Sequence, residues 1–294
     1  MDTSLTCKIC GSSTRELGSI RGRFKTKLFY IRHCQICRFS YVANPWVEWE
    51  EIYSEDYYAG RGADPSVGYE YETRNPTRSI RQYELQGILR AVSSLISVRN
   101  DTEWLDFGCG NGSLLDFLTR IPNGPRAAGF EEGWTVEETR KRGLKVISRT
   151  ELEGLTKCFD VVTAIEVLEH SEYPIQTLKL IREFLKPGGL FFYTTGNSEP
   201  FRNSILSWSY LVPEVHISFF EPKTMELALT KAGFTPEFRG YLPGYTEIIR
   251  FKILKNLGLK DISTMEKMLP WHLLSRLADL RFQVTAHPIG WAGA

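Results

Sequence analysis

The amino-acid sequence predicts an α/β protein with a doubly wound, mostly parallel sheet, a small zinc ribbon before the sheet and a helical tail after it. Three observations predict this fold class. Strand and helix patterns alternate from residue 103 onward, as they do in a parallel sheet. A glycine-rich loop follows the first strand of that series, and two C-x-x-C pairs lie near the N-terminus. We therefore expect a zinc-binding ribbon at residues 1–44, an aromatic-rich linker with lid helices at 45–98, a ligand-binding sheet domain at 99–245 and a helical extension at 246–294.

The composition is that of a globular protein with a hydrophobic core, since 42% of the 294 residues are hydrophobic and 24% are charged. Lys and Arg number 36 against 35 acidic residues, so the net charge is +1. A near-neutral chain lacks the basic field that attracts nucleic acid, which predicts no DNA partner and argues against RNA. The sequence shows no signal-peptide pattern and no apolar run long enough to span a bilayer, which predicts a cytoplasmic protein without a transmembrane segment.

Four cysteines in the first part have the spacing of a zinc site. They form two C-x-x-C pairs separated by 23 residues, Cys7 with Cys10 and Cys34 with Cys37. In a reducing compartment such pairs serve metal binding or redox chemistry, and two matched pairs favour a tetrahedral Cys₄ zinc ribbon. Four thiolates leave no open coordination position, so we expect the zinc to be structural.

The segment 45–98 is rich in aromatic and charged residues and ends in a helical pattern. It can form a lid over a bound ligand or a linker with aromatic packing. Residues 186–189, Lys-Pro-Gly-Gly, are expected to end a helix and turn the chain into the fifth strand. Strands are expected at residues 103–107, 126–130, 145–147, 159–165, 189–195 and 235–241.

The most informative stretch is the glycine loop after the first strand. Its glycines let the backbone approach a ligand at the carboxyl end of a parallel strand. The spacing departs from the dinucleotide fingerprint, and Asp106 would repel a pyrophosphate but suits a cationic ligand. Glu131, 19 residues beyond Gly112, is placed to accept hydrogen bonds from ribose hydroxyls, although either acid could instead cap a helix. The residues expected to bind the ligand are Asp106, Gly108, Cys109, Gly110, Gly112, Glu131, Glu132 and Glu166.

Several motifs of the sheet domain resemble one enzyme family over about residues 100–245. Residues 106–112 resemble the first motif of class I S-adenosylmethionine-dependent methyltransferases. Residues 159–170 and 185–197 resemble the fourth and fifth strands of their ubiquinone-biosynthesis-like branch, although Gly196 stands where that branch more often has proline. The stretches 219–224 and 231–234 also recur there. The resemblance implies a Rossmann-like fold, S-adenosylmethionine as cofactor and methyl transfer to a small polar acceptor.

Two glutamates and two histidines follow the fourth and fifth strands. If a helix begins after the fourth strand, Glu166, Glu169 and His170 share one of its faces. With His216 they could hold a divalent cation such as Mg²⁺, Mn²⁺ or Zn²⁺, which lowers the pKa of an acceptor hydroxyl. This pattern resembles the Mg-dependent site of small-RNA 2′-O-methyltransferases. Without a metal, His170 or His216 would act as general base, and the remaining alternative is a local capping pair.

A zinc module before such a domain resembles the sugar methyltransferases of bacterial polysaccharide and antibiotic pathways. The larger sugar C-methyltransferases of that group carry a third domain, for which 294 residues leave no room. The expected function is O-methylation of a sugar hydroxyl, nucleotide-linked or within a glycan, in carbohydrate biosynthesis. The alternatives are a phenolic or RNA-terminal diol as acceptor, a sugar C-methyltransferase, and a non-catalytic binding module.

The tail from residue 246 combines apolar positions at helical spacing with Arg250, Lys252 and Lys255. Such a face can contact a membrane surface. Packing on the core or on a second subunit is the more usual role of an amphipathic helix, and we expect packing.

Overall fold

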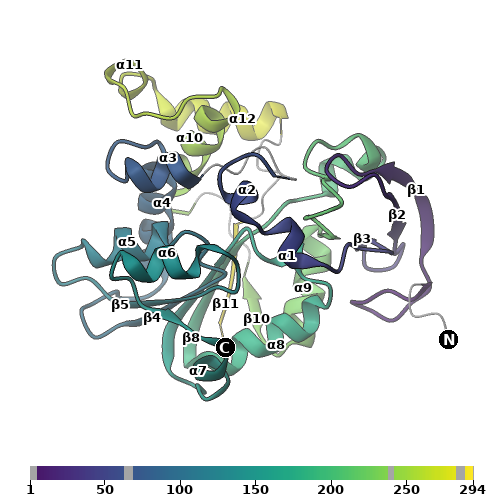
Figure 1. The fold of residues 1–294 in the computed structure, drawn as a ribbon, viewed down its shortest axis with the longest axis horizontal. Helices are drawn as coiled ribbons and strands as arrows, with labels where there is room; N and C mark the ends of the chain where they lie inside the picture. Colours follow the sequence, from purple (N-terminus) through teal and green to yellow (C-terminus); the bar gives the residue numbers. More distant parts are fainter. Residues whose placement is uncertain (1–4, 63–68, 238–241, 283–288, 294) are drawn as a thin grey trace.

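The computed structural model describes residues 5–62, 69–237, 242–282 and 289–293 of the chain. It contains a seven-stranded sheet flanked by helices and a four-stranded antiparallel sheet that curves along the right-hand side of Figure 1. Within the described residues, no helix is both long and apolar enough to cross a membrane.

The larger sheet confirms the predicted parallel α/β architecture. Its strands are, in chain order, β4 (Glu103–Phe107), β5 (Arg126–Phe130), β6 (Val146–Ile147), β7 (Phe159–Ile165), β8 (Leu185–Thr194), β10 (Thr235–Glu237) and β11 (Ile289–Gly293). The order across the sheet is β10-β11-β8-β7-β4-β5-β6. The strands from β6 to β8 pair in parallel, whereas β11 is antiparallel to both of its neighbours. The carboxyl ends of five parallel strands therefore meet along one edge, where open sheets of this kind bind ligands.

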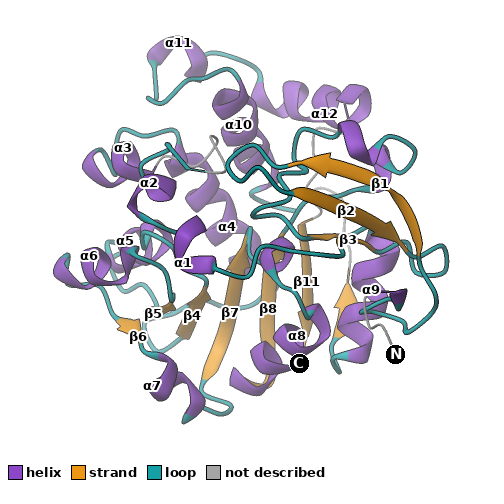
Figure 2. Cartoon of the chain, turned by 45° about the vertical axis from the view of Figure 1, so that its right-hand side comes forward, coloured by secondary structure: helices purple, strands orange, loops and turns teal. Residues whose placement is uncertain are grey.

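Helices cover both faces of this sheet, as Figure 2 shows. One face packs against α4 (Arg81–Leu95), α5 (Ser113–Thr119) and α10 (Tyr245–Asn256). The other packs against α7 (Arg149–Glu153), α8 (Pro174–Phe184) and α9 (Pro222–Lys231). The remaining helices are α1 (Trp49–Ile52), α2 (Glu55–Tyr58), α3 (Tyr69–Arg74), α6 (Thr135–Lys141), α11 (Thr264–Lys267) and α12 (Trp271–Phe282). Short 3₁₀ turns lie at η2 (Leu168–His170), η3 (Glu199–Phe201) and η4 (Ile205–Ser207).

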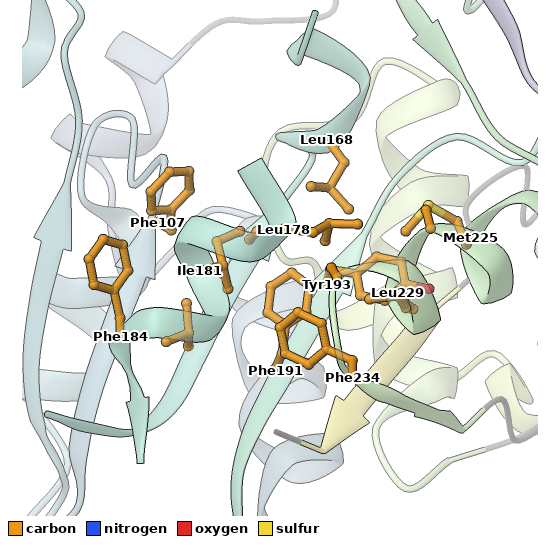
Figure 3. Close-up of a cluster of buried hydrophobic side chains, with 14 of the residues drawn as sticks. Phe107, Leu168, Leu178, Ile181, Phe184, Phe191, Tyr193, Met225, Leu229 and Phe234 are labelled. Atoms are coloured by element: carbon orange, nitrogen blue, oxygen red, sulfur yellow. The ribbon is translucent and has the colours of Figure 1, made fainter. Parts of the chain in front are cut away.

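The side chains of the central strands alternate between these two helical layers, as the two-residue period of a strand requires. Trp104 and Phe192 pack with α4 and α5, whereas Leu105 and Phe191 pack with α8 and α9. Figure 3 shows the second layer, in which the aromatic rings of β8 lie between α8 and α9. Burial on both faces explains the nearly continuous apolar sequence of β7 and β8.

The smaller sheet begins in the cysteine-rich part of the chain but is not confined to it. Its strands are β1 (Arg15–Arg21), β2 (Leu28–His33), β3 (Ser40–Val42) and β9 (Ser218–Phe219). The first three form an antiparallel ribbon, and β9 joins it by pairing with β3. One sheet therefore connects the predicted ribbon to a segment of the sheet domain that follows β8.

The start of the fifth parallel strand differs from the prediction. β8 begins at Leu185, so residues 186–189 lie within the strand instead of turning the chain into it. Gly188 has a φ angle of 76°, and the register between β7 and β8 shifts between Phe159 and Val161. Phe159 pairs with Leu185 and Val161 pairs with Leu190, so one residue of β7 lies opposite four of β8, and residues 186–189 form an irregular segment between the two paired parts of the strand.

The tail is helical over α10, α11 and α12, as predicted, and differs from the prediction at its last strand. α10 packs on α4 so closely that a Cβ on Gly87 would lie 2.6 Å from the carbonyl oxygen of Gly244. The chain then continues through α11 and α12 but ends as β11, inside the sheet. The sequence of β11 contains two glycines and no alternation of apolar residues, so it carries no strand signal. Of the expected strand at 235–241, residues 235–237 form β10 and the rest lie outside the described residues.

Candidate functional site

The glycine loop, residues 106–112, is shaped by three left-handed glycines. The φ angles of Gly108, Gly110 and Gly112 are 76°, 52° and 71°, a region that favours glycine. A Cβ at Gly108 would lie 2.6 Å from Val167 Cγ2, so this position also needs glycine for packing. A Cβ at Gly110 would meet no atom closer than 3.9 Å. The middle glycine therefore faces space that a ligand can reach.

Asp106 lies at the end of β4 directly before this loop, and its carboxyl group is buried. Thr163 Oγ1 donates a hydrogen bond of 2.8 Å to Asp106 Oδ1. Burial raises the pKa of Asp106 to about 7, and the hydrogen bond from Thr163 opposes this rise. A nearby cation would stabilise the ionised form, so the position suits a positively charged ligand group.

Glu131 follows β5 and faces the glycine loop. Its Oε2 accepts a hydrogen bond of 2.9 Å from the backbone N–H of Gly110, and its Oε1 accepts from the N–H groups of Glu132 and Gly133. The aromatic segment lies over this region, because a Cβ on Gly133 would overlap the hydroxyl of Tyr58. The carboxylate is thus held by backbone groups at the loop, beside the rings of the predicted lid.

Two residues expected at the ligand lie elsewhere. The side chain of Cys109 turns into the core, where it packs with Leu115 and Val146, so only its backbone borders the loop. Glu132 points away from the loop, and its carboxylate forms an ion pair of 2.6 Å with Arg149 on the surface. The structure brings together Asp106, the three glycines and Glu131, and it separates Glu132 from them.

A second group of functional side chains, which we call the Glu–His cluster, consists of Glu169, His170 and His216. Each offers one ligand atom, and these atoms all lie within 4.8 Å of one another. Glu169 and His170 belong to η2 at the carboxyl end of β7, and His216 lies between η4 and β9. The centroids of the two imidazole rings are 5.0 Å apart. The cluster therefore assembles from two segments far apart in the sequence.

Glu166 does not belong to the Glu–His cluster. The sequence predicts that Glu166, Glu169 and His170 share one face of a helix, and the structure differs. A 3₁₀ turn forms after β7 in place of an α-helix, and Glu166 has a φ angle of 55°. Its Oε1 accepts a hydrogen bond of 2.8 Å from Thr194 Oγ1 and lies 3.4 Å from Lys252 Nζ. Glu166 thus lies beside the cluster, at the junction with α10.

Both histidines of the cluster have their Nδ1 atoms next to backbone carbonyl groups. His216 Nδ1 lies 2.6 Å from the carbonyl oxygen of Tyr210, and His170 Nδ1 lies 2.9 Å from that of Val215. A carbonyl only accepts, so Nδ1 carries the proton and the acceptor lone pair is on Nε2. Metal-binding histidines commonly donate their other N–H in this way, and a general base needs the same tautomer.

Glu169 is the buried carboxylate of the cluster. Its two oxygens accept hydrogen bonds of 2.5 Å from Tyr210 Oη and 2.7 Å from Thr195 Oγ1. Burial and the neighbouring charge of Glu166 together raise the pKa of Glu169 to about 8, although the hydrogen bonds from Tyr210 and Thr195 oppose this rise. A buried acid beside two imidazoles can bind a divalent cation in its ionised form.

Sequence reasoning missed Tyr210, a central residue of this site. Tyr210 connects its two sides, since its hydroxyl donates to Glu169 and lies 3.2 Å from Glu166 Oε2. The Tyr210 ring also stacks on His216 with centroids 4.1 Å apart. Tyr53, which belongs to the aromatic segment that was expected to form a lid or a linker, contributes a hydroxyl 2.9 Å from His170 Nδ1. Tyr210 lies in an irregular segment whose spacing matches no motif, so only the fold reveals it.

The four cysteines of the ribbon form a second, separate cluster. Their sulfur atoms lie within 4.8 Å of one another, with 3.4 Å between Cys7 and Cys37 and 3.4 Å between Cys10 and Cys34. All four are free thiols. Thiolates around zinc at about 2.3 Å each would be about 3.8 Å apart, so the residues fit a tetrahedral zinc site.

Comparison with known proteins agrees with the class that the fold and the glycine loop define. A family model described as a methyltransferase domain matches residues 77–237. This is more than half of the chain, which therefore belongs to the methyltransferase domain family. Within that family it is a class I S-adenosylmethionine-dependent methyltransferase, as the fold and the motifs of the sheet domain predict.

Curated relatives are ubiquinone biosynthesis O-methyltransferases. The protein of Nitrosococcus oceani is 36% identical over 106 residues, covering 33% of this chain and 44% of the relative. That of Saccharophagus degradans is 35% identical over 140 residues, covering 41% and 58%. The chain thus spans about half the length of the curated relatives it matches.

Among solved structures, the plantazolicin methyltransferase BamL, in complex with a triazolic desmethylPZN analog and SAH, has a similar fold. The TM-score is 0.51 at 14% identity, and the match covers 84% of this chain and 96% of the other. At this identity the likeness supports the fold alone.

Proposed function

We propose that this protein transfers a methyl group from S-adenosylmethionine to one hydroxyl of a small acceptor that carries a second hydroxyl beside it, with a sugar as the first candidate. The observation that carries the proposal is the Glu–His cluster at the carboxyl edge of the sheet. Two imidazoles with their Nδ1 atoms directed to carbonyl groups, and one buried carboxylate, are suited to activating a hydroxyl.

The glycine loop would bind the methyl donor. S-adenosylmethionine supplies an electrophilic methyl group on a positively charged sulfur. Asp106 would face the positive charges of this molecule, and Glu131 would accept hydrogen bonds from its ribose hydroxyls. Binding by Glu131 requires its carboxylate to exchange the backbone N–H of Gly110 for a ligand hydroxyl, or to accept both. Glu166, which was also expected to bind the donor, lies beside the Glu–His cluster, where the Tyr210 hydroxyl contacts both Glu166 and Glu169.

The Glu–His cluster would activate the acceptor. His216 would take the proton of the hydroxyl on Nε2, while the oxygen forms a bond to the methyl carbon and the carbon–sulfur bond breaks. In this step the sulfur keeps the electron pair and becomes neutral. If Glu169, His170 and His216 instead hold a divalent cation, His216 Nε2 would be one of its ligands and not the base, and the cation would lower the pKa of the hydroxyl. Catalysis would otherwise rest on aligning the two reactants in a buried site.

A sugar diol suits the aromatic surroundings of the cluster. Rings of Tyr53 and Tyr210 lie beside the two histidines, and aromatic side chains commonly line the sites that bind small molecules. The resemblance of the zinc module to that of sugar methyltransferases also supports this acceptor. A nucleotide-linked or glycan-bound sugar would fit an enzyme of carbohydrate biosynthesis.

A phenolic diol is the second candidate. The curated relatives are ubiquinone biosynthesis O-methyltransferases, and their name favours a phenolic acceptor for related sites. A catechol presents two neighbouring hydroxyls to the Glu–His cluster as a sugar diol does. The net charge of +1 argues against a long RNA acceptor.

The test uses labelled S-adenosylmethionine with matched acceptor panels. One panel contains nucleotide-linked and free sugars with adjacent hydroxyls, another contains catechols, and each has counterparts that lack one hydroxyl. We expect label on one member of a diol panel, a much smaller signal on its mono-hydroxyl counterpart, and stimulation by added Mg²⁺ or Mn²⁺. Calorimetry with S-adenosylhomocysteine verifies that the donor site is intact. Tight binding with no label on any hydroxylated acceptor would contradict the proposal.

A further inference from the structure

The loop that carries His216 shares a hydrophobic core with the zinc ribbon. We call residues 199–217 the histidine loop. Its apolar side chains pack against the ribbon sheet in one buried cluster, distinct from the cluster in which Cys34, Cys37 and Phe39 of the ribbon pack with the large sheet. The members of this shared core are Phe29, Ile31 and Val42 of the ribbon with Ile205, Trp208, Leu211, Ile217 and Phe219 of the loop and β9.

Backbone hydrogen bonds connect the ribbon to the residue after His216. The N–H of Val42 donates to the carbonyl oxygen of Ile217 at 2.9 Å, and the N–H of Ile217 donates to the carbonyl oxygen of Glu169 at 2.8 Å. The next two residues form β9 and pair with β3. Ile217 therefore connects the backbone of Glu169 to the ribbon, and it fixes the distance between Glu169 and the neighbouring His216.

A buried glutamate connects the histidine loop to the far end of the ribbon. Glu214 is fully buried, and its Oε1 accepts hydrogen bonds from the N–H groups of Phe24 (2.9 Å) and Lys25 (3.3 Å). These two residues form the turn between β1 and β2. Glu214, two positions before His216 in the histidine loop, thus accepts the hydrogen bonds of the turn at the tip of the ribbon hairpin.

Stacked rings lead from the shared core to the Glu–His cluster. The ring centroids of Trp208, a member of the shared core, and Tyr210 are 4.9 Å apart, and those of Tyr210 and His216 are 4.1 Å apart. A displacement of Trp208 would therefore move the ring that stacks on His216.

The zinc end of the ribbon is also hydrogen-bonded to the catalytic domain. Thr224 Oγ1 of α9 donates a hydrogen bond of 2.7 Å to the carbonyl oxygen of Cys37.

The glycine loop is held by other parts of the molecule. The N–H groups of Gly108 and Cys109 donate to the carbonyl oxygen of Phe130 in β5, and Asn111 Nδ2 donates to Thr73 Oγ1 of α3. None of these three hydrogen bonds involves a residue of the ribbon.

We propose that the zinc ribbon supports the acceptor side of the active site, by which we mean the Glu–His cluster and Tyr210. In this proposal Glu214 is a positioning residue for His216. Zinc folds the ribbon, the ribbon fixes Glu214 and Ile217, and these set the position of His216 against Glu169 and His170. The inference rests on the proposed function for the role of His216. Loss of zinc then lets the Glu–His cluster and Tyr210 move. The donor side, which comprises Asp106, the glycine loop and Glu131, stays in place.

The first experiment compares the full-length protein with a Cys34→Ser/Cys37→Ser variant by zinc analysis, amide hydrogen exchange and calorimetry with S-adenosylhomocysteine. We expect loss of zinc, at least tenfold faster exchange across residues 205–219, and a Kd for S-adenosylhomocysteine within about threefold of the original. Unchanged protection of residues 205–219 in the zinc-free variant would overturn the inference. Neither readout needs an acceptor, so failure of the proposed function would not be mistaken for failure of this one.

A second pair of variants keeps zinc bound, in case the cysteine variant does not fold. Glu214→Leu removes the acceptor for Phe24 and Lys25, whereas Glu214→Gln retains a carbonyl oxygen that can accept from the same N–H groups. We expect faster exchange of residues 205–219 and lower kcat in Glu214→Leu, and substantial rescue in Glu214→Gln. Equal exchange and turnover in all three proteins, with zinc retained, would refute the positioning role.

Discussion

The donor side and the acceptor side of the proposed active site are built in contrasting ways. The donor side comprises Asp106, the glycine loop and Glu131, and it lies within two consecutive strand–loop units of the sheet. The acceptor side comprises the Glu–His cluster and Tyr210, and it combines η2, the histidine loop and the support of an N-terminal ribbon. The first is local in sequence, while the second depends on contacts between distant segments. The donor side can therefore be recognised from one motif, whereas the acceptor side is recognised from the sequence only in part, because Tyr210 and the contacts with the ribbon appear only in the fold.

The largest expected effect is a loss of turnover on replacing His216, a change that should affect the acceptor side and leave the donor side intact. His216→Ala should lower kcat by about 10²–10⁴-fold, because a positioned general base contributes about that much. The Kd for S-adenosylhomocysteine should stay unchanged, since the glycine loop is untouched. Steady-state kinetics with the acceptor found in the panels and calorimetry check both values. His272→Ala, an exposed histidine of α12, is the control, and equal loss in both variants would contradict the assignment.

A pair of glycine variants tests how rigid the donor side is. Gly112 and Gly143 have φ angles of 71° and 78°, but a Cβ at Gly112 would lie 2.6 Å from Thr139 Cγ2, whereas one at Gly143 would meet nothing within 4 Å. Gly143→Ala should cost about 1–2 kcal/mol of unfolding free energy for the left-handed backbone alone. Gly112→Ala should cost about 2–5 kcal/mol, because overpacking is added. Denaturant unfolding measures both, and equal costs would mean that the loop can shift freely.

Two neighbouring glutamates test which acid binds the donor. Glu131→Gln should weaken binding of S-adenosylhomocysteine by about 10–100-fold, because hydrogen bonds to a charged acceptor contribute about 1.5–3 kcal/mol. Glu132→Gln should leave the affinity unchanged, since Glu132 pairs with Arg149 on the surface. Calorimetry on both variants gives the comparison. A similar loss in Glu132→Gln would restore that residue to the donor site.

The smallest expected effect is a pH dependence of donor binding. The pKa of Asp106 is raised to about 7, so its carboxyl group is largely protonated at pH 6 and largely ionised at pH 8. If the ionised form binds the ammonium group of S-adenosylhomocysteine, affinity should rise up to about tenfold over this interval. Asp106→Asn should weaken binding and remove the slope. A slope that persists in Asp106→Asn would assign the titration to another group.

The sequence-based prediction succeeded where local pattern decides the structure. The strands at 103–107, 126–130 and 159–165 agree with β4, β5 and β7, because each is a short apolar run between clear turn signals. It failed at β11, whose glycines carry no pattern and whose strand conformation depends on pairing with β8 and β10. Glu166 was misplaced for a similar reason, since a left-handed residue after β7 cannot be read from residue spacing.

The candidate site was also only partly predictable, because some of its residues are placed by tertiary packing and not by local pattern. Glu169, His170 and His216 were foreseen as a group, and the structure brings them together. Tyr210 and Lys252 were not foreseen in this role, because each reaches Glu166 from an element whose position is set by tertiary packing. Residues selected for a partner across the fold leave no trace in the spacing of their own segment.

The pairing of β3 with β9 has a consequence for the order in which the protein can be made. During synthesis Ser40 and Tyr41 leave the ribosome long before Ser218 and Phe219, the residues with which they pair. The nascent ribbon can capture zinc early, yet one edge of its sheet stays open until the rest of the catalytic domain has emerged. An open strand edge can pair with another chain, so this interval is a window for aggregation. Slow translation between β3 and β9 would lengthen that window.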